Sequence, residues 1–269
     1  MKEVWIWLVS ALVSDLFKKI ILLITLQALA STALAQAEAP IQVEVGSSLD
    51  TFDKSYMANW RGNYVDVEKK LGERRAVYGS LRESERYGMK DTEMLAGIYH
   101  PLAARWTLLT EGNVSPSHNV LAKWSAMEQI QYSLDDGWGV HLGLRHTEYD
   151  SAVINIVQVV GERYWSNYRA AYTHTISALT YDGYASNDRV QLSRYYAERS
   201  WVGIGISQGA EIENVGPPLG VLSTTVRNTG LNGRHWLNRD WAIFYEAYVN
   251  QQGSLYTRNG LRFGLRHEF

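Results

Sequence analysis

Apolar and polar residues alternate without interruption over the end of the chain. Leu261, Phe263 and Leu265 share one parity, while Arg262 and Arg266 fall on the other. A period of two is typical of a β-strand that has one apolar face and one polar face. We therefore expect residues 257–269 to form such a strand, and similar segments can be followed back through most of the chain.

From residue 41 onward the pattern predicts fourteen strands, at 41–49, 59–70, 75–86, 92–100, 104–113, 123–134, 138–149, 152–161, 165–176, 187–197, 200–209, 220–232, 238–250 and 257–269. Two of them are weaker, because 152–161 is apolar on both faces and 220–232 shows little contrast. Twelve strands are the alternative count if two weak segments are loops. No helical period extends over a useful length.

The connections predict an up-and-down arrangement. Short turns follow the even-numbered strands, around 72–73, 101–102, 135–137, 162–164, 198–199 and 234–237. The opposite connections are mostly longer, as at 114–122, 177–186 and 210–219. An even number of strands brings both ends of the sheet to one side, expected to be the periplasmic one. We predict an all-β fold, a transmembrane up-and-down antiparallel β-barrel; a soluble β-sandwich is the alternative.

Composition favours the membrane protein. The chain has 10 Trp and 17 Tyr but only 5 Phe, and Trp and Tyr are the residues that form girdles at membrane interfaces. Lys and Arg number 26 against 28 Asp and Glu, so no basic excess indicates a nucleic-acid partner. The absence of Cys excludes disulfides, thiolate metal sites and Cys nucleophiles.

The N-terminal part has the features of a secretory signal peptide. Two lysines at 18–19 precede a short apolar stretch at 20–30, and small residues follow. We predict a signal peptide at 1–37, cleaved after Ala35 or Ala37, with residues 1–15 as an over-extended start; a helical anchor is the alternative. The remainder, 38–269, has no apolar run of roughly 18 residues, so we expect a single barrel domain.

The last strand also resembles the C-terminal assembly signal of bacterial outer-membrane β-barrels. Arg262, Gly264, His267 and Phe269 fall on the four positions of that signal, although His267 stands where Tyr or Phe is usual. The resemblance implies insertion into outer-membrane lipid by the barrel assembly machinery.

Several motifs together resemble one family. The runs are 85–93, 99–102, 115–118, 143–149 and 164–169, with Trp60 before them and 194–196 after them. In this order they are similar to the YaiO family of outer-membrane β-barrel proteins, over nearly all of residues 41–269. The resemblance implies a barrel in the outer membrane of Gram-negative bacteria and transfers no catalytic residue. Some relatives look associated with envelope polysaccharide machinery, which makes that machinery a candidate partner.

The polar parity predicts a charged lumen. The residues expected to face inward are Tyr64, Asp66, Glu68, Arg82, Glu111, His141, Arg145, Arg169, Glu246, Arg262, Arg266 and Glu268. Two interpretations remain open. The charges either line a pore and select a solute, or they form a ladder of ion pairs that fills a closed lumen.

Glu128 does not fit this pattern. It shares its parity with Trp124, Ala126, Ile130 and Tyr132, the expected lipid face. A charge facing lipid is costly, so we expect a local bulge that turns Glu128 inward. A functional carboxylate embedded in the membrane is the alternative.

Candidate chemistry is sparse. Ser115, Ser117 and His118 lie together on a predicted loop, but no nucleophile elbow accompanies them, and turn chemistry explains the serines. The histidines show no metal-ligand spacing. We expect no catalytic residue, metal or cofactor, and we assign the aromatic pairs 164–165 and 195–196 to an interfacial girdle rather than to sugar stacking.

Three functions follow in order of preference. The first is a passive pore or conduit for small polar or saccharide solutes. The second is a plugged structural or interaction barrel that supports an envelope complex. A lipid- or glycan-modifying enzyme of the outer membrane is the third.

Overall fold

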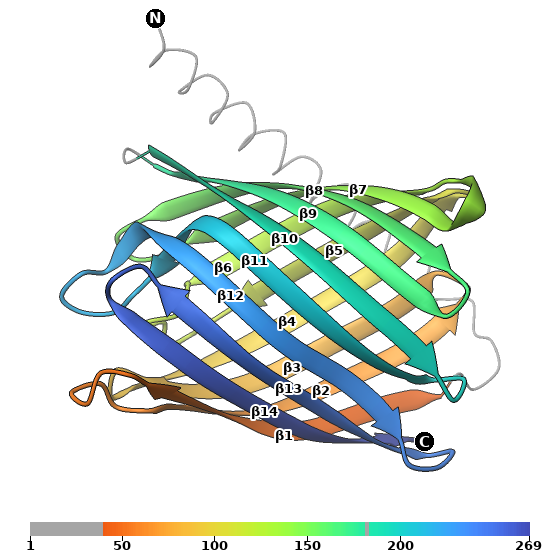
Figure 1. Ribbon diagram of the computed structural model, residues 1–269, viewed down its shortest axis with the longest axis horizontal. Coiled ribbons are helices and arrows are strands. Elements are labelled where there is room, and N and C mark those ends of the chain that lie inside the picture. The colour runs from red at the N-terminus through yellow and green to blue at the C-terminus, as the bar shows by residue number, and fades with distance from the viewer. Residues whose placement is uncertain (1–39, 181–182) are drawn as a thin grey trace, which may run out of the picture. The chain divides into compact units, whose positions relative to one another are not determined.

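The computed structural model describes residues 40–180 and 183–269, and the predicted signal peptide at 1–37 lies outside them. The described residues form a closed barrel of fourteen antiparallel strands (Figure 1). The strands are β1 (Ile41–Phe52), β2 (Trp60–Gly72), β3 (Arg75–Arg86), β4 (Met89–Ala103), β5 (Trp106–Val114), β6 (Trp124–Ser133), β7 (Trp138–Glu148), β8 (Val153–Trp165), β9 (Tyr168–Leu179), β10 (Gly183–Tyr196), β11 (Ser200–Asn214), β12 (Val221–Trp236), β13 (Trp241–Gln252) and β14 (Tyr256–Glu268). The predicted fold class and the count of fourteen are confirmed.

The barrel closes where its first and last strands meet. β1 pairs with β14 from Gln42 opposite Glu268 to Phe52 opposite Arg258, and the two strands lie side by side in Figure 1. The amide of Phe269 donates to the carbonyl of Ile41 over 2.9 Å, which extends the ladder to the last residue. Every strand thus has two partners, and no sheet edge is left open. The use of 262–269 as an assembly signal stays a prediction.

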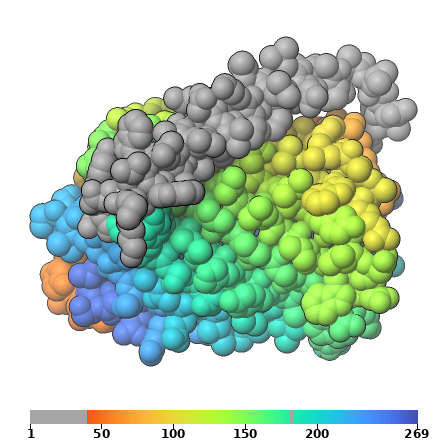
Figure 2. Space-filling view, turned by 90° about the horizontal axis from the view of Figure 1, so that it is seen from above, coloured from red at the N-terminus to blue at the C-terminus, as the bar shows by residue number. Residues whose placement is uncertain are grey.

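Alternation places apolar residues outside and polar residues inside. Val45, Leu81, Ile206 and Leu261 are exposed on the outer face, and Figure 2 shows one side of this face as a closed surface. The inner face instead carries charged, amide and hydroxyl groups. No helix within 40–180 and 183–269 is long and apolar enough to cross a membrane.

Several connections differ from those expected from the sequence. Residues 101–102 and 162–164 lie inside β4 and β8, and the true turns are 104–105 and 166–167. β12 likewise runs to Trp236, which moves the next turn to 237–240. The strands are longer than the alternation indicated because their end residues, such as Pro101, Leu102 and Ala103 of β4, do not alternate between apolar and polar. For the same reason β9 extends to Leu179 and β10 begins at Gly183, both inside the loop expected at 177–186.

One opposite connection is also a tight hairpin. β3 and β4 are joined only by Tyr87 and Gly88, whose φ angles are +55° and +75°. Two consecutive positive φ angles are the geometry of a two-residue hairpin turn. The longer connections on this side are 53–59, 115–123 and 215–220.

Outward-facing aromatic rings gather at the end of the barrel where β1 begins and β14 ends. Trp106 packs on Tyr132 at 4.4 Å between ring centroids, and Trp165 stacks on Tyr168 at 5.9 Å. Of the aromatic pair 164–165, only Trp165 points outward, where a girdle residue would lie, and the girdle itself stays a prediction. Tyr164 lies beneath the inward-facing Arg169 and beside Tyr195, 6.4 Å away, because neighbours on a strand point to opposite faces.

Candidate functional site

The charged residues expected in the lumen all lie on the inner face, but they separate into different groups. Asp66, Arg82, Arg262, Arg266 and Glu268 surround the seam between β1 and β14, Glu111 pairs with Arg145, His141 and Arg169 share Glu162, and Glu246 lines a hollow elsewhere. One wall is therefore cross-linked by ion pairs, whereas another is not.

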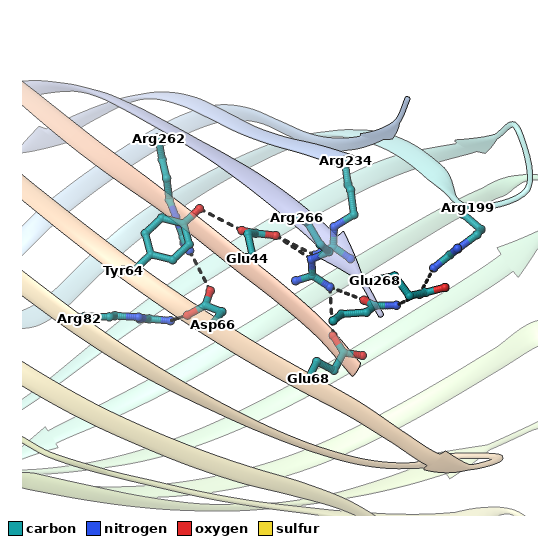
Figure 3. A network of polar contacts seen from close by, with 11 residues as sticks. Glu44, Tyr64, Asp66, Glu68, Arg82, Arg199, Arg234, Arg262, Arg266 and Glu268 are labelled. Carbon is teal, nitrogen blue, oxygen red and sulfur yellow. Dashed lines mark hydrogen bonds and ion pairs between the residues drawn. The ribbon is translucent and has the colours of Figure 1, made fainter. Parts of the chain in front are cut away.

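The seam is organised by a buried ion pair (Figure 3). Nε of Arg266 donates to Oε2 of Glu44 over 2.9 Å, and the two side chains are only 7% and 3% exposed. The other carboxylate oxygen of Glu44 accepts from the Tyr64 hydroxyl at 2.9 Å. Nη1 of Arg266 donates to Gln42 at 2.6 Å and to Glu68 at 3.3 Å. Both buried charges are thus paired and hydrogen-bonded, as burial requires.

The same network continues along β2 and β3. Asp66 accepts from Arg262 at 3.3 Å and from the Ser80 hydroxyl at 2.5 Å, and Arg82 lies 3.9 Å away. The guanidinium of Arg262 also lies 3.9 Å from the ring centroid of Tyr64. These contacts join β14 to β2 and β3 across β1.

Gly264 has a packing role in this network. A Cβ at that position would collide with the Tyr64 hydroxyl, and Gly46 on the neighbouring strand has the same relation to Tyr64. The glycine of the C-terminal motif therefore leaves room for the tyrosine ring to lie flat across the seam.

Sequence reasoning missed three charged members of the network. Glu44 could have been found, because it has the polar parity of the first predicted strand. Arg199 and Arg234 were hidden because they were assigned to turns; Arg199 pairs with Glu268, and Arg234 approaches Glu44 to 3.7 Å.

Two smaller clusters cross-link the wall further along. Glu111 accepts from the Tyr78 hydroxyl at 2.7 Å and from Arg145 at 2.8 Å. Glu162 contacts His141 at 3.1 Å and accepts from Arg169 at 2.7 Å. Each cluster joins side chains from different strands, so it holds their register as well as filling space.

The wall formed by β8 to β14 is different. It encloses a hollow of about 440 Å³ between inward-facing amide, hydroxyl and charged groups. Arg189, Glu211, Glu213 and Glu246 line it, and none of the four makes a hydrogen bond or close ion pair within the described residues. This part of the lumen therefore keeps polar groups available to a solute.

The connection 115–123 and the end of β11 meet at one mouth of the barrel. The Asp91 carboxylate accepts from the backbone amides of Asn119, Val120 and Leu121 at 2.7, 2.7 and 2.9 Å, which folds 115–123 over β4. Asn214, from the opposite side of the barrel, donates to the carbonyl of Val120 at 2.8 Å.

An aromatic cluster lies at the same end of the lumen. Trp60 is 2% exposed and contacts Phe52 and Tyr87, each with ring centroids 5.0 Å away. Arg86 and Arg258 lie over the Trp60 ring at 5.0 and 4.8 Å. This cluster narrows the lumen at this mouth.

The candidate nucleophiles have structural roles in this mouth. The Ser115 hydroxyl donates to the carbonyl of Thr92 at 2.8 Å, and the Ser117 hydroxyl accepts from the Thr92 amide at 3.0 Å.

Lys123 binds Asp150 at 2.7 Å, and this hydrogen bond lowers the pKa of the exposed Asp150 carboxyl. Within 40–180 and 183–269 no group of three potential metal ligands comes together.

Glu128 contradicts the predicted bulge. The pairing of β6 with both neighbours is continuous through Glu128, so the carboxylate stays on the outer face. One oxygen accepts from the Thr110 hydroxyl at 2.9 Å, and the other is buried without a partner. A cross-strand hydroxyl, rather than an inward turn, is what accommodates the charge.

Comparison with known proteins agrees with the fold. The family model described as the YaiO membrane beta barrel domain matches residues 41–214, and β12 to β14 complete the same barrel beyond that match. No curated protein sequence matches the chain. The family match identifies the barrel as an outer-membrane protein, which confirms the predicted localisation.

Solved structures add the fold alone. The chain is similar to a bacterial polysaccharide outer membrane secretin, with 10% identity, a TM-score of 0.54, and coverage of 87% of this chain and 100% of that one. It is also similar to the KdgM porin, with 8% identity, a TM-score of 0.45 and coverage of 84% and 99%. A third similar structure is the translocator domain of the autotransporter NalP from Neisseria meningitidis, with 13% identity and a TM-score of 0.47. The match covers 95% of this chain and 98% of that one.

Removing one member of the buried pair should be costly. Arg266→Ala leaves the Glu44 carboxylate buried without its partner, so the free energy of unfolding should fall by about 3–5 kcal/mol. Urea unfolding in detergent micelles measures this change. Arg105→Ala is the matched control, because its partner Asp135 is 79% exposed, and it should cost less than about 1 kcal/mol. Equal effects of the two substitutions would contradict the central role of the seam.

Removing the outer carboxylate should have the opposite sign. Glu128→Leu should raise the free energy of unfolding by roughly 1–2 kcal/mol, because an acid in the lipid-facing belt costs somewhat less than the about 2–4 kcal/mol of a midplane Arg or Lys. The measurement is unfolding in lipid vesicles. Glu83→Leu is the control: it is exposed near the end of β3 and should change little. A loss of stability in Glu128→Leu would mean that this carboxylate supports the fold.

Proposed function

The chain belongs to the YaiO membrane β-barrel family, and on that premise we propose that it is a narrow, passive pore for small polar or saccharide solutes. The observation that carries the proposal is the hollow in the wall of β8 to β14, with its unpaired polar and charged groups. Charged and polar linings of this kind select solutes by size, hydrogen bonding and charge.

The size of the barrel supports a narrow passage. Barrels of eight strands are filled by side chains, whereas those of 16–18 strands enclose an aqueous channel. Fourteen strands lie between these limits, so a few long side chains decide whether the passage is open. Here the ion pairs line one part of the inner wall, whereas the part around the hollow has none within the described residues.

A plugged barrel is the second candidate, and the mouth formed by 115–123 and 215–220 favours it. The last residue of β11, Asn214, donates to Val120 of the first connection, and Trp60 fills space below. A barrel closed in this way would present its connections to an envelope partner, such as polysaccharide machinery, rather than conduct a solute. The two candidates differ in one measurable property, which is conductance.

Conductance of the purified protein in a planar lipid bilayer tests the proposal. We expect discrete current steps, and Arg189→Glu should shift the reversal potential in a KCl gradient toward cation selectivity, because Arg189 lines the hollow. Arg105→Glu, in the exposed turn at 104–105, should leave the reversal potential unchanged.

A silent bilayer would contradict the pore, provided that insertion is shown by a mobility change on heating. Asp91→Ala then identifies the cause, since it frees the backbone of 119–121. Steps that appear only in this variant would assign the closure to the connection 115–123, and the plugged barrel would be the native state.

A further inference from the structure

The hollow owes its space to glycines on the inner wall. Gly205 on β11 lies directly opposite Gly230 on β12, and both line the hollow. Neither has a positive φ, and a Cβ at Gly205 would meet its nearest neighbour, Gln191, only at 3.5 Å. The backbone at Gly205 would therefore accept a side chain, so the strand geometry does not require a glycine at this position.

Buried polar groups around the hollow lack partners. Asn187 and Asn250 are each 6% exposed, and Nδ2 of the first and Oδ1 of the second make no hydrogen bond. Nε of Arg258 is also a buried atom that makes no hydrogen bond. All three residues line the hollow. Buried polar atoms in native proteins are almost always hydrogen-bonded, so three orphans around one space indicate a polar occupant.

The chemistry of the lining defines the class of that occupant. Amides such as Asn228 and Asn232 offer both donors and acceptors, and Thr173 and Ser207 add hydroxyls. A ligand that matches them must itself carry many groups that donate and accept, as hydroxyls do.

The charges around the hollow argue against an anionic ligand. Glu211, Glu213 and Glu246 face only two guanidinium groups, those of Arg189 and Arg258. An added carboxylate would therefore meet a slight excess of like charge. The volume of about 440 Å³ lies within the range of small-ligand sites, about 300–1,000 Å³.

We propose that this hollow is a binding site for an uncharged saccharide of one or two rings. The inference rests on the proposed pore, in which the site would hold the solute on its way through the lumen. Tyr248 supplies the aromatic side of the site: its hydroxyl donates to Asp50 at 2.5 Å, and its ring covers Gly260. The ring is thus fixed in place on the wall before any solute arrives.

Titration calorimetry on the full protein in detergent micelles tests the site, with maltose as the neutral probe and digalacturonate as the anionic one. Maltose should bind, and digalacturonate should bind at least about tenfold more weakly. Gly205→Leu fills the hollow and should weaken maltose binding by about tenfold or more, the equivalent of one or two lost hydrogen bonds.

Gly143→Leu is the matched control. Gly143 also lies on the inner wall, its nearest neighbour would be 3.5 Å from a Cβ, and it does not line the hollow. Its maltose affinity should equal that of the unchanged protein. Asn250→Leu provides a second variant that does not depend on filling space. It should weaken maltose binding without lowering stability, because it removes an unsatisfied buried atom.

The outcomes separate this inference from the pore. Current steps without maltose binding would show that the hollow holds only water, which overturns the site and leaves the pore. Maltose binding that Gly205→Leu abolishes, without current steps, would support the site and contradict the pore. Tighter binding of digalacturonate than of maltose would overturn the assigned ligand class. Equal maltose affinity of Gly205→Leu and Gly143→Leu would overturn the assigned position of the site.

Discussion

The structure depends on the closure of the sheet between β1 and β14. In a membrane every backbone donor and acceptor of a strand must be paired, and an open edge cannot face lipid. The ladder from Gln42 to Phe52 meets this requirement with backbone bonds, and the Glu44–Arg266 pair adds a buried side-chain link across the same seam. Closure also fixes which face is the lumen. Since the seam joins residues more than two hundred positions apart, its charges favour one register over all others.

The inner wall then divides into two parts with different physical roles. Around the seam and along β3 to β9, carboxylates lie within hydrogen-bonding distance of guanidinium, imidazole and hydroxyl groups. These charges are therefore neutralised by partners within the protein. Around the hollow between β8 and β14, inner-wall glycines leave space, and Arg189, Glu211, Glu213 and Glu246 make no close ion pair within the described residues. One amide atom each of Asn187 and Asn250 also lacks a hydrogen-bond partner there. A uniform ladder of ion pairs would argue for a filled lumen. This asymmetry instead leaves part of the lumen free to interact with a solute.

Much of the fold could be predicted because a barrel strand is encoded locally. The alternation around Val65 and Asp66, or Leu265 and Arg266, shows the face of each side chain without knowledge of its neighbours. The limits of strands such as β8 could not be predicted, since the residues at their ends do not alternate between apolar and polar. The bulge expected at Glu128 was wrong for a related reason: its partner Thr110 is on another strand, and register between strands is not visible in one segment.

The candidate site was predictable only in part. Parity identifies inward-facing charges, including Arg145 and Glu246, but it does not tell which of them are paired. That distinction depends on contacts between strands and, at Gly205, on the missing side chain of a facing residue. The hollow was therefore absent from the sequence interpretation, although most of the strands that form it were present.

The most direct measurement of the central claim is the accessibility of two adjacent residues on β11 to a water-soluble thiol reagent. The chain has no cysteine, so Ser207→Cys and Ile206→Cys each introduce a single thiol, the first lining the hollow and the second exposed on the outer face. In lipid vesicles, a small charged thiosulfonate should modify the thiol of Ser207→Cys and spare that of Ile206→Cys. Protection of Ser207→Cys, or modification of Ile206→Cys instead, would contradict a polar, water-filled lumen inside an apolar outer wall.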